Sequence, residues 1–164
     1  MTYAFAQSAT ATITTSAEAL FAYLDDQASL GSHMEKPSMM MMGGTMHYIL
    51  DAAAGRAVGS VIRMEGRFLW IGLTVEEVVT ERDPPRRKSW QTRGVPRLII
   101  MGGYRMGFQI APQNDAQLLS VAIDYDWPAS GIGRMLAALL ARTYARWCVG
   151  RMARDAARHF RQDA

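Results

Sequence analysis

The chain has 164 residues, of which 49% are hydrophobic and 20% charged, a balance typical of a globular domain and not of a disordered segment. A lone cysteine, Cys148, excludes an internal disulfide or a multi-thiolate metal site, and a formal net charge of only +3 indicates no nucleic-acid partner. Because no segment has the roughly 20 apolar residues of a membrane span or the pattern of a signal peptide, we expect one cytoplasmic domain over residues 1–164.

The first part of the chain predicts one strand and one short helix. Residues 3–14 alternate loosely between apolar and polar positions, which indicates a strand. Thr15 and Glu18 fit a capping box, and apolar residues at helical spacing then predict a helix over residues 16–28. Residues 30–44 contain three glycines and a proline, which favour a second short helix or an irregular connection.

Six further strands are predicted before the last element, because each segment is rich in β-branched or aromatic residues and turn-forming residues separate them. One of these breaks is a bend at Gly66. The short connections favour antiparallel neighbours. The expected strands are 45–52, 57–65, 67–82, 86–93, 97–111 and 117–127.

The last predicted element is a long helix. Ser130 is expected to cap it, and no proline interrupts it up to about Gln162. One helical face is apolar and is expected to lie against the sheet: Ile132, Leu136, Leu139, Leu140, Thr143 and Trp147. Four arginines further along form a basic face that is either simply solvated or directed towards an anionic lipid or acidic partner: Arg151, Arg154, Arg158 and Arg161.

This order of elements predicts an α+β fold. Seven antiparallel strands can bury both their own face and the helix only if the sheet curls around the long C-terminal helix, with the two short helices placed after the first strand. A bent sheet cannot close on the helix everywhere. We therefore expect an apolar space between them, and concave apolar sites of this kind bind small molecules.

Several stretches, in their order and spacing, carry a family resemblance: residues 16–26, 58–66, 79–87, and 125–128 leading into 133–136. They are similar to the START-like (SRPBCC, helix-grip, Bet v 1-like) superfamily, in its polyketide cyclase/dehydrase and lipid-transport branch. The resemblance implies a helix-grip fold with a deep hydrophobic ligand cavity between sheet and helix. It does not imply one activity, because members include lipid and hormone binders, cyclases, hydroxylase domains and chaperone activators.

Alternate residues of a strand share a face, so the apolar sets of the expected strands predict the lining of the cavity. Most members are expected to be ordinary core, but as a group they indicate an aromatic and methionine-rich lining. Among them Tyr48, Tyr104 and Tyr125 are favoured for hydrogen bonding to a ligand, because each has a hydroxyl on an apolar body. The ligand-binding candidates are Met46, Tyr48, Trp70, Trp90, Tyr104, Met106, Phe108, Tyr125, Leu136, Leu139, Leu140, Thr143 and Trp147.

Two neighbouring glutamates add a polar candidate to this lining. Because Glu76 and Glu77 are adjacent, one of them shares a face with apolar residues unless a bulge intervenes. A buried carboxyl would have a raised pKa and could act as a general acid or base, whereas a glutamate reaching solvent is the simpler interpretation. Glu77 and His47 are the candidate polar anchors, and with no metal-ligand cluster or phosphate loop in the sequence we expect neither metal nor cofactor.

Four consecutive methionines lie in the segment before the second expected strand: Met39, Met40, Met41 and Met42. Methionine is soft and adaptable, so this run could form a lid over the cavity mouth, touch a membrane, or bind cuprous copper together with histidines. Plain loop packing is the simplest interpretation, and the lid is the leading functional hypothesis.

These sequence features are compatible with three classes of function. The first is the binding, transport or sensing of a hydrophobic small molecule such as a lipid, quinone or polyketide. The alternatives are a cyclase, dehydratase or hydrolase that uses the same pocket without a metal, and a protein-interaction module with a filled core. The binding function ranks first because no catalytic constellation is visible. Two inward, mutually hydrogen-bonded titratable groups would reverse that ranking.

Overall fold

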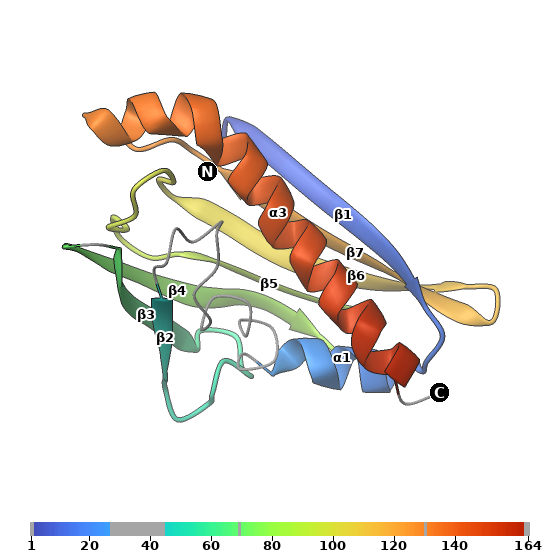
Figure 1. Cartoon of the computed structure of the whole chain (residues 1–164). Helices are drawn as coiled ribbons and strands as arrows, with labels where there is room; N and C mark the ends of the chain where they lie inside the picture. Colours follow the sequence, from blue (N-terminus) through green and yellow to red (C-terminus); the bar gives the residue numbers. More distant parts are fainter. Residues whose placement is uncertain (1, 27–44, 69, 130, 163–164) are drawn as a thin grey trace.

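A curved antiparallel sheet and a long C-terminal helix dominate the structure (Figure 1). The computed structural model describes residues 2–26, 45–68, 70–129 and 131–162. The elements in chain order are β1 (Phe5–Ile13), α1 (Ala17–Asp25), β2 (Thr45–Leu50), β3 (Val61–Phe68), β4 (Ile71–Asp83), β5 (Arg87–Thr92), β6 (Tyr104–Gln113), β7 (Ala116–Tyr125) and α3 (Ile132–Gln162).

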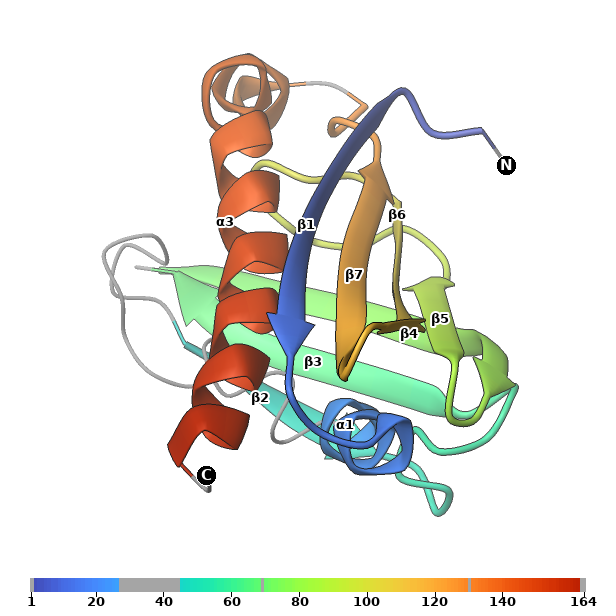
Figure 2. The same cartoon turned by 90° about the vertical axis from the view of Figure 1, so that its right-hand side faces the viewer.

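The seven strands form a single sheet in the order β1-β7-β6-β5-β4-β3-β2. Each strand from β2 to β6 pairs with the next one in sequence, and β1 completes the sheet by pairing with β7. In Figure 2, α3 lies alongside β1 and β7, while β2, β3 and β4 run across the molecule behind it. The predicted α+β helix-grip fold is confirmed.

The predicted bend at Gly66 is wrong. β3 continues through this glycine, which pairs with Met46 on one side and with Leu73 on the other. A glycine is tolerated there because two neighbouring strands hold its backbone. The chain turns only after Phe68, so the boundary between the second and third of the six expected strands moves by several residues.

The strand predicted over residues 97–111 begins later than expected. Arg97 makes an isolated bridge to Thr74, with N–H···O distances of 2.7 and 3.1 Å, and regular pairing resumes only at Tyr104. The apolar residues between them favour a strand by composition, but the pairing with β4 diverts the backbone. Residues 98–103 form an irregular segment that precedes β6.

α1 begins one residue later than the capping prediction placed it. Ser16, and not Thr15, is the N-cap, and its hydroxyl accepts a hydrogen bond from the Ala19 N–H at 3.1 Å. The Ser130 cap, the second short helix within residues 30–44 and the four-methionine run lie outside the described residues. In the part of the chain that the structure describes, no helix is long and apolar enough to cross a membrane.

The face of α3 that packs on the sheet differs from the predicted one. Its buried residues are mostly small, and they lie against β1 and β7: Ala137, Ala141, Ala145, Val149, Met152, Ala153 and Ala156. The residues of the predicted face are exposed or only partly buried: Ile132, Leu136, Leu139, Leu140, Thr143 and Trp147. The prediction followed the large apolar residues, whereas small side chains let the helix backbone approach a strand closely.

Replacing Ala141 with leucine should destabilise the fold. Ala141 is fully buried in the seam between α3 and the sheet, so a larger side chain would force the helix away. We expect chemical denaturation to show a loss of about 1–3 kcal/mol in the free energy of unfolding. A138L, on the exposed side of the same helix, is the matched control and should change it by less than about 0.5 kcal/mol. Equal effects of the two substitutions would contradict this packing.

Candidate active site

β4 places a carboxyl group on the inner face of the sheet. Burial alternates along this strand, and Leu73, Val75, Glu77 and Val79 are its buried residues. The register shift against β5 falls after Val79, so the alternation is unbroken as far as Glu77. The inward glutamate is therefore Glu77, which is only 3% exposed and alternates with buried apolar residues along the strand.

Glu76 lies on the outer face of the same strand. Its carboxylate accepts a hydrogen bond from Arg63 at 3.1 Å and forms an ion pair with Arg93 at 3.4 Å. Surface pairs of this kind contribute little to stability. The two adjacent glutamates thus have different environments, which the sequence pattern could not assign.

Two inward side chains hydrogen-bond to Glu77. Tyr104, from β6, is buried and donates its hydroxyl to the carboxylate. The indole of Trp90, from β5, hydrogen-bonds to the same group. Thr92 lies directly opposite Glu77 on β5, and its hydroxyl accepts the backbone N–H of Tyr104 at 3.1 Å. Three adjacent strands therefore fix the positions of these groups.

The environment of Glu77 prepares it to exchange a proton at neutral pH. Burial raises its pKa to about 7, although the hydrogen bonds from Tyr104 and Trp90 and the charge of Lys88 oppose the shift. Burial, together with the negative charge of Glu77, raises the pKa of Tyr104 well above its ordinary value, so this phenol remains a donor. A carboxyl that titrates near pH 7 beside a fixed O–H donor can act as a general acid or base.

Two more tyrosines lie near this cluster. Tyr48 on β2 and Tyr144 on α3 both contribute to the raised pKa of Tyr104. The side chains of Tyr144 and Cys148 hydrogen-bond to each other, and burial raises the pKa of the Cys148 thiol to about 12, so it stays protonated. The sequence pattern does not predict Tyr144 as a site residue, because it favours the leucine-rich face of the helix.

Four other predicted strand residues also lie on the inner side of the sheet. Met46 and Phe108 are buried in the core, and Met106 is partly buried on the inner face of β6. Tyr125 is also buried, and its ring packs on Phe5 with a centroid distance of 5.5 Å. These four residues share the inner side of the sheet with Glu77, as strand alternation predicts.

Two predicted residues do not share that inner side. His47 is exposed on the outer face of β2, because Met46 takes the inward position next to it. Trp70 lies at the turn between β3 and β4 and is 80% exposed. Among the described residues, no group of three or more histidine, cysteine, aspartate or glutamate side chains could hold a metal ion.

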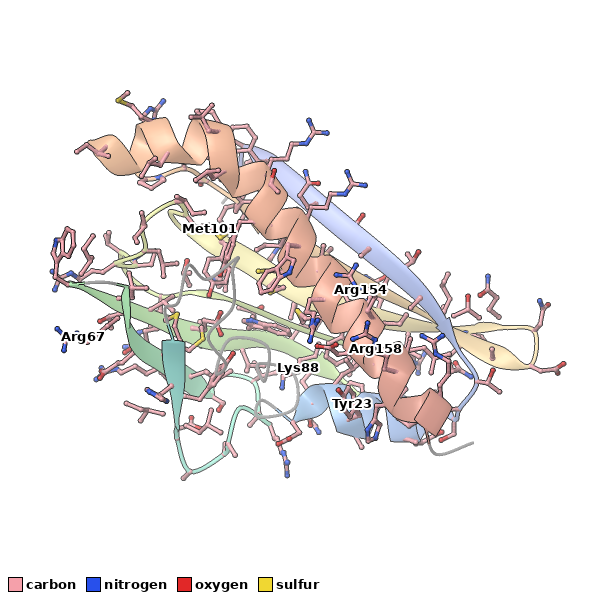
Figure 3. The ribbon with its side chains drawn as sticks, viewed as in Figure 1. Tyr23, Arg67, Lys88, Met101, Arg154 and Arg158 are labelled. Atoms are coloured by element: carbon pink, nitrogen blue, oxygen red, sulfur yellow. The ribbon has the colours of Figure 1, made fainter. Side chains whose placement is uncertain are left out.

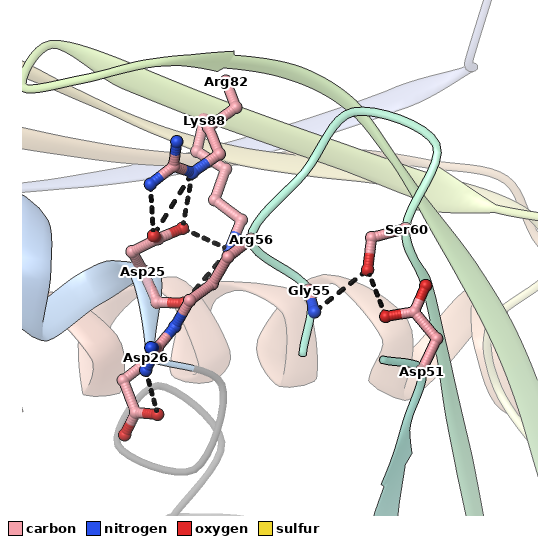
Figure 4. A network of polar contacts seen from close by, with 8 residues as sticks. All are labelled: Asp25, Asp26, Asp51, Gly55, Arg56, Ser60, Arg82 and Lys88. Atoms are coloured by element: carbon pink, nitrogen blue, oxygen red, sulfur yellow. Dashed lines mark hydrogen bonds and ion pairs between the residues drawn. The ribbon is translucent and has the colours of Figure 1, made fainter. Parts of the chain in front are cut away.

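A second polar cluster lies at the end of α1 (Figure 4). Lys88, from β5, is buried, and its Nζ donates to Asp25 Oδ1 at 2.8 Å and to the Asp25 carbonyl at 3.2 Å. Arg82, from β4, donates to the same carboxylate at 2.8 Å. Burial opposes the ionisation of Asp25, but the hydrogen bonds from Arg82 and Lys88 outweigh it and lower the pKa of Asp25.

Lys88 connects the two clusters. Figure 3 shows it inside the grip, near α1, whereas Arg154 and Arg158 lie on α3. The Lys88 ammonium is 6.0 Å from the centre of the Trp90 ring, and its charge lowers the pKa of Glu77. No local pattern predicts the contact between Lys88 and Asp25, because 63 positions of sequence separate the two residues.

Comparison with known proteins identifies the family. The sequence matches the family described as polyketide cyclase / dehydrase and lipid transport over residues 5–161, and the chain belongs to this family. Among curated proteins, none matches the sequence.

Solved structures share the fold at low sequence identity. Protein TTHA0849 from Thermus thermophilus has a TM-score of 0.69 at 11% identity, over 97% of this chain and 99% of that chain. Major latex-like protein 151 from Panax ginseng has a TM-score of 0.62 at 12% identity, over 95% and 97% of the two chains. The di-domain ARO/CYC BexL from the BE-7585A biosynthetic pathway has a TM-score of 0.62 at 18% identity, over 95% of this chain and 50% of that chain.

Removing Asp25 should cost more stability than removing Lys88. In D25A the buried Lys88 ammonium loses its counter-ion, which is expected to lower the free energy of unfolding by about 3–5 kcal/mol. In K88M the Asp25 carboxylate keeps Arg82, so the loss should be smaller. Urea denaturation of both variants measures the difference. A larger loss in K88M than in D25A would contradict the described pairing.

The stability of the protein should fall as the pH rises from about 4.5 to about 7. The pKa of Glu77 is raised from 4.5 to about 7 in the folded protein, so over this range the folded state holds a proton that the unfolded state has released. The penalty reaches about 3 kcal/mol above pH 7. E77Q removes this cost of ionising Glu77. The free energy of unfolding of E77Q, relative to that of wild type, should therefore rise by about 3 kcal/mol between pH 4.5 and pH 7. E76Q is the control. A constant difference between E77Q and wild type would contradict the buried position.

Proposed function

We propose that the protein binds a hydrophobic, oxygen-bearing small molecule between the sheet and α3, that Glu77 removes a proton from this molecule, and that Tyr104 stabilises the resulting negative charge through a hydrogen bond. The buried hydrogen bond between these two inward titratable groups carries the proposal. This pair meets the condition that favours an enzyme over a carrier. The family description, which names cyclases and dehydrases, supports the same class of reaction.

Cyclisation of a polyketone, and dehydration of the β-hydroxy ketone that the cyclisation forms, both begin with the loss of a proton from a carbon next to a carbonyl. The ionised Glu77 carboxylate would accept that proton, and the C–H electron pair would move into an enolate. Tyr104 would then turn its hydrogen bond from Glu77 towards the enolate oxygen, where the negative charge collects. In a dehydration, the protonated Glu77 would give its proton to the departing hydroxyl group, which leaves as water.

The surroundings of the pair indicate the class of ligand. Met106 and Trp147 are partly buried and provide apolar surface next to the cluster. Tyr48, on β2, and Tyr144, on α3, provide further hydroxyl groups. An apolar ring system with several oxygen atoms would satisfy both kinds of surface, because apolar area supplies affinity and the phenols fix orientation.

Proton transfer can be measured without knowledge of the natural substrate. 2-Tetralone has acidic hydrogens on the carbon next to its carbonyl. ¹H NMR in D₂O follows the exchange of these hydrogens for deuterium. We expect wild-type protein to accelerate the exchange, with a rate that rises through about pH 7 as Glu77 ionises. E77Q should lose about 10²–10⁴-fold of the acceleration, and Y104F a smaller part. E65Q, on the outer face, should match wild type.

A carrier is the second candidate, because the family description also names lipid transport. Saturable binding of 2-tetralone with no exchange above the buffer rate would reject the enzyme and leave the carrier. Native mass spectrometry with lipid extraction, on protein purified from its own source, then tests the carrier directly. An apolar molecule that co-purifies would support it, and protein free of any such molecule would reject it.

A further inference from the structure

Three segments lie at one end of the molecule, at the left of Figure 1: the β3–β4 turn, residues 93–103 and the start of α3. The bridge between Arg97 and Thr74 joins the first two. Gly133, in the first turn of α3, approaches residue Ile99 so closely that a Cβ would lie 2.6 Å from its carbonyl oxygen. The three segments therefore form one continuous end of the fold.

Large apolar side chains project from all three segments. We call them the apolar rim, and its members are Trp70, Val95, Ile132, Met135 and Leu139. Their exposed fractions run from 73% for Met135 to 93% for Val95. Single exposed apolar residues are ordinary on protein surfaces, but five on adjoining segments indicate a surface that binds a partner.

Within the three segments that carry the apolar rim, the charges are of one sign. In residues 67–75, 93–103 and 131–142 every charged residue is an arginine. Arg67, Arg97 and Arg134 are exposed, and Figure 3 shows Arg67 at this end. Arg93 is the member with an acidic partner, since it pairs with Glu76 at 3.4 Å. The stretch from residue 127 to 154 continues this bias, with five arginines and no acidic residue.

We propose that the apolar rim docks on an anionic lipid surface. Its side chains project from separate segments, and a fluid interface accepts such projections without a matching shape, whereas a folded partner requires one. Tryptophan favours the boundary between headgroups and acyl chains, and the arginines are attracted to anionic headgroups. The proposal does not depend on proton transfer at Glu77.

Co-sedimentation with vesicles tests the docking. We expect the full chain to bind vesicles of phosphatidylcholine mixed with phosphatidylglycerol, to bind pure phosphatidylcholine much more weakly, and to be released by salt. R97Q and R134Q should each lower the partition coefficient about fivefold. W70S and L139S should each lower it about tenfold or more.

Matched controls separate the rim from general surface properties. V58S removes an exposed apolar residue, 64% exposed, from the loop at the other end of β3, and R158Q removes an exposed arginine near the other end of α3. Both should bind like wild type. Equal binding to neutral and anionic vesicles, or equal losses in rim and control variants, would overturn the proposal. Binding to polyglutamate with no binding to vesicles would also overturn it and assign the surface to an acidic protein.

Discussion

The central physical constraint in this protein is a carboxyl group enclosed by the apolar inner face of the sheet. A charged carboxylate in that position loses its hydration, and it is tolerated only because fixed donors replace the lost water. Tyr104 and Trp90 provide those donors from the two strands that follow β4 in the sheet. The opposing effects of burial and hydrogen bonding leave the pKa of Glu77 at about 7, where both protonation states are available for chemistry.

The second polar cluster supports this arrangement from the other side of Trp90. Asp25 neutralises Lys88 at the end of α1, so a cation can be buried within reach of the Trp90 ring. Lys88 in turn favours the ionised form of Glu77. The packing of α1 on the sheet therefore influences the electrostatics of the candidate active site, through the contacts of Asp25 with Lys88 and of Lys88 with Trp90.

Local patterns were sufficient for the architecture and for much of the inner face. The element order predicted the helix-grip fold, and alternation along β6 and β7 placed Tyr104, Phe108 and Tyr125 inward. Alternation could not decide between Glu76 and Glu77, because one bulge reverses parity and the bulge position depends on pairing with β5. The contact of Asp25 with Lys88 depends on tertiary packing, which neither spacing nor hydrophobicity encodes. The alanines of the α3 seam do recur at helical spacing, but a prediction that follows the large apolar residues selects another face of the helix.

The pKa of Glu77 is the quantity that tests the proposed chemistry most directly. A ¹³C NMR titration of the glutamate side-chain carboxyls, with E77Q used to assign the signal, measures it without any ligand. We expect this signal to titrate at about pH 7, well apart from those of the surface glutamates. A midpoint near the ordinary value of 4.5 would show that the carboxyl is solvated, and it would contradict the proposed proton transfer.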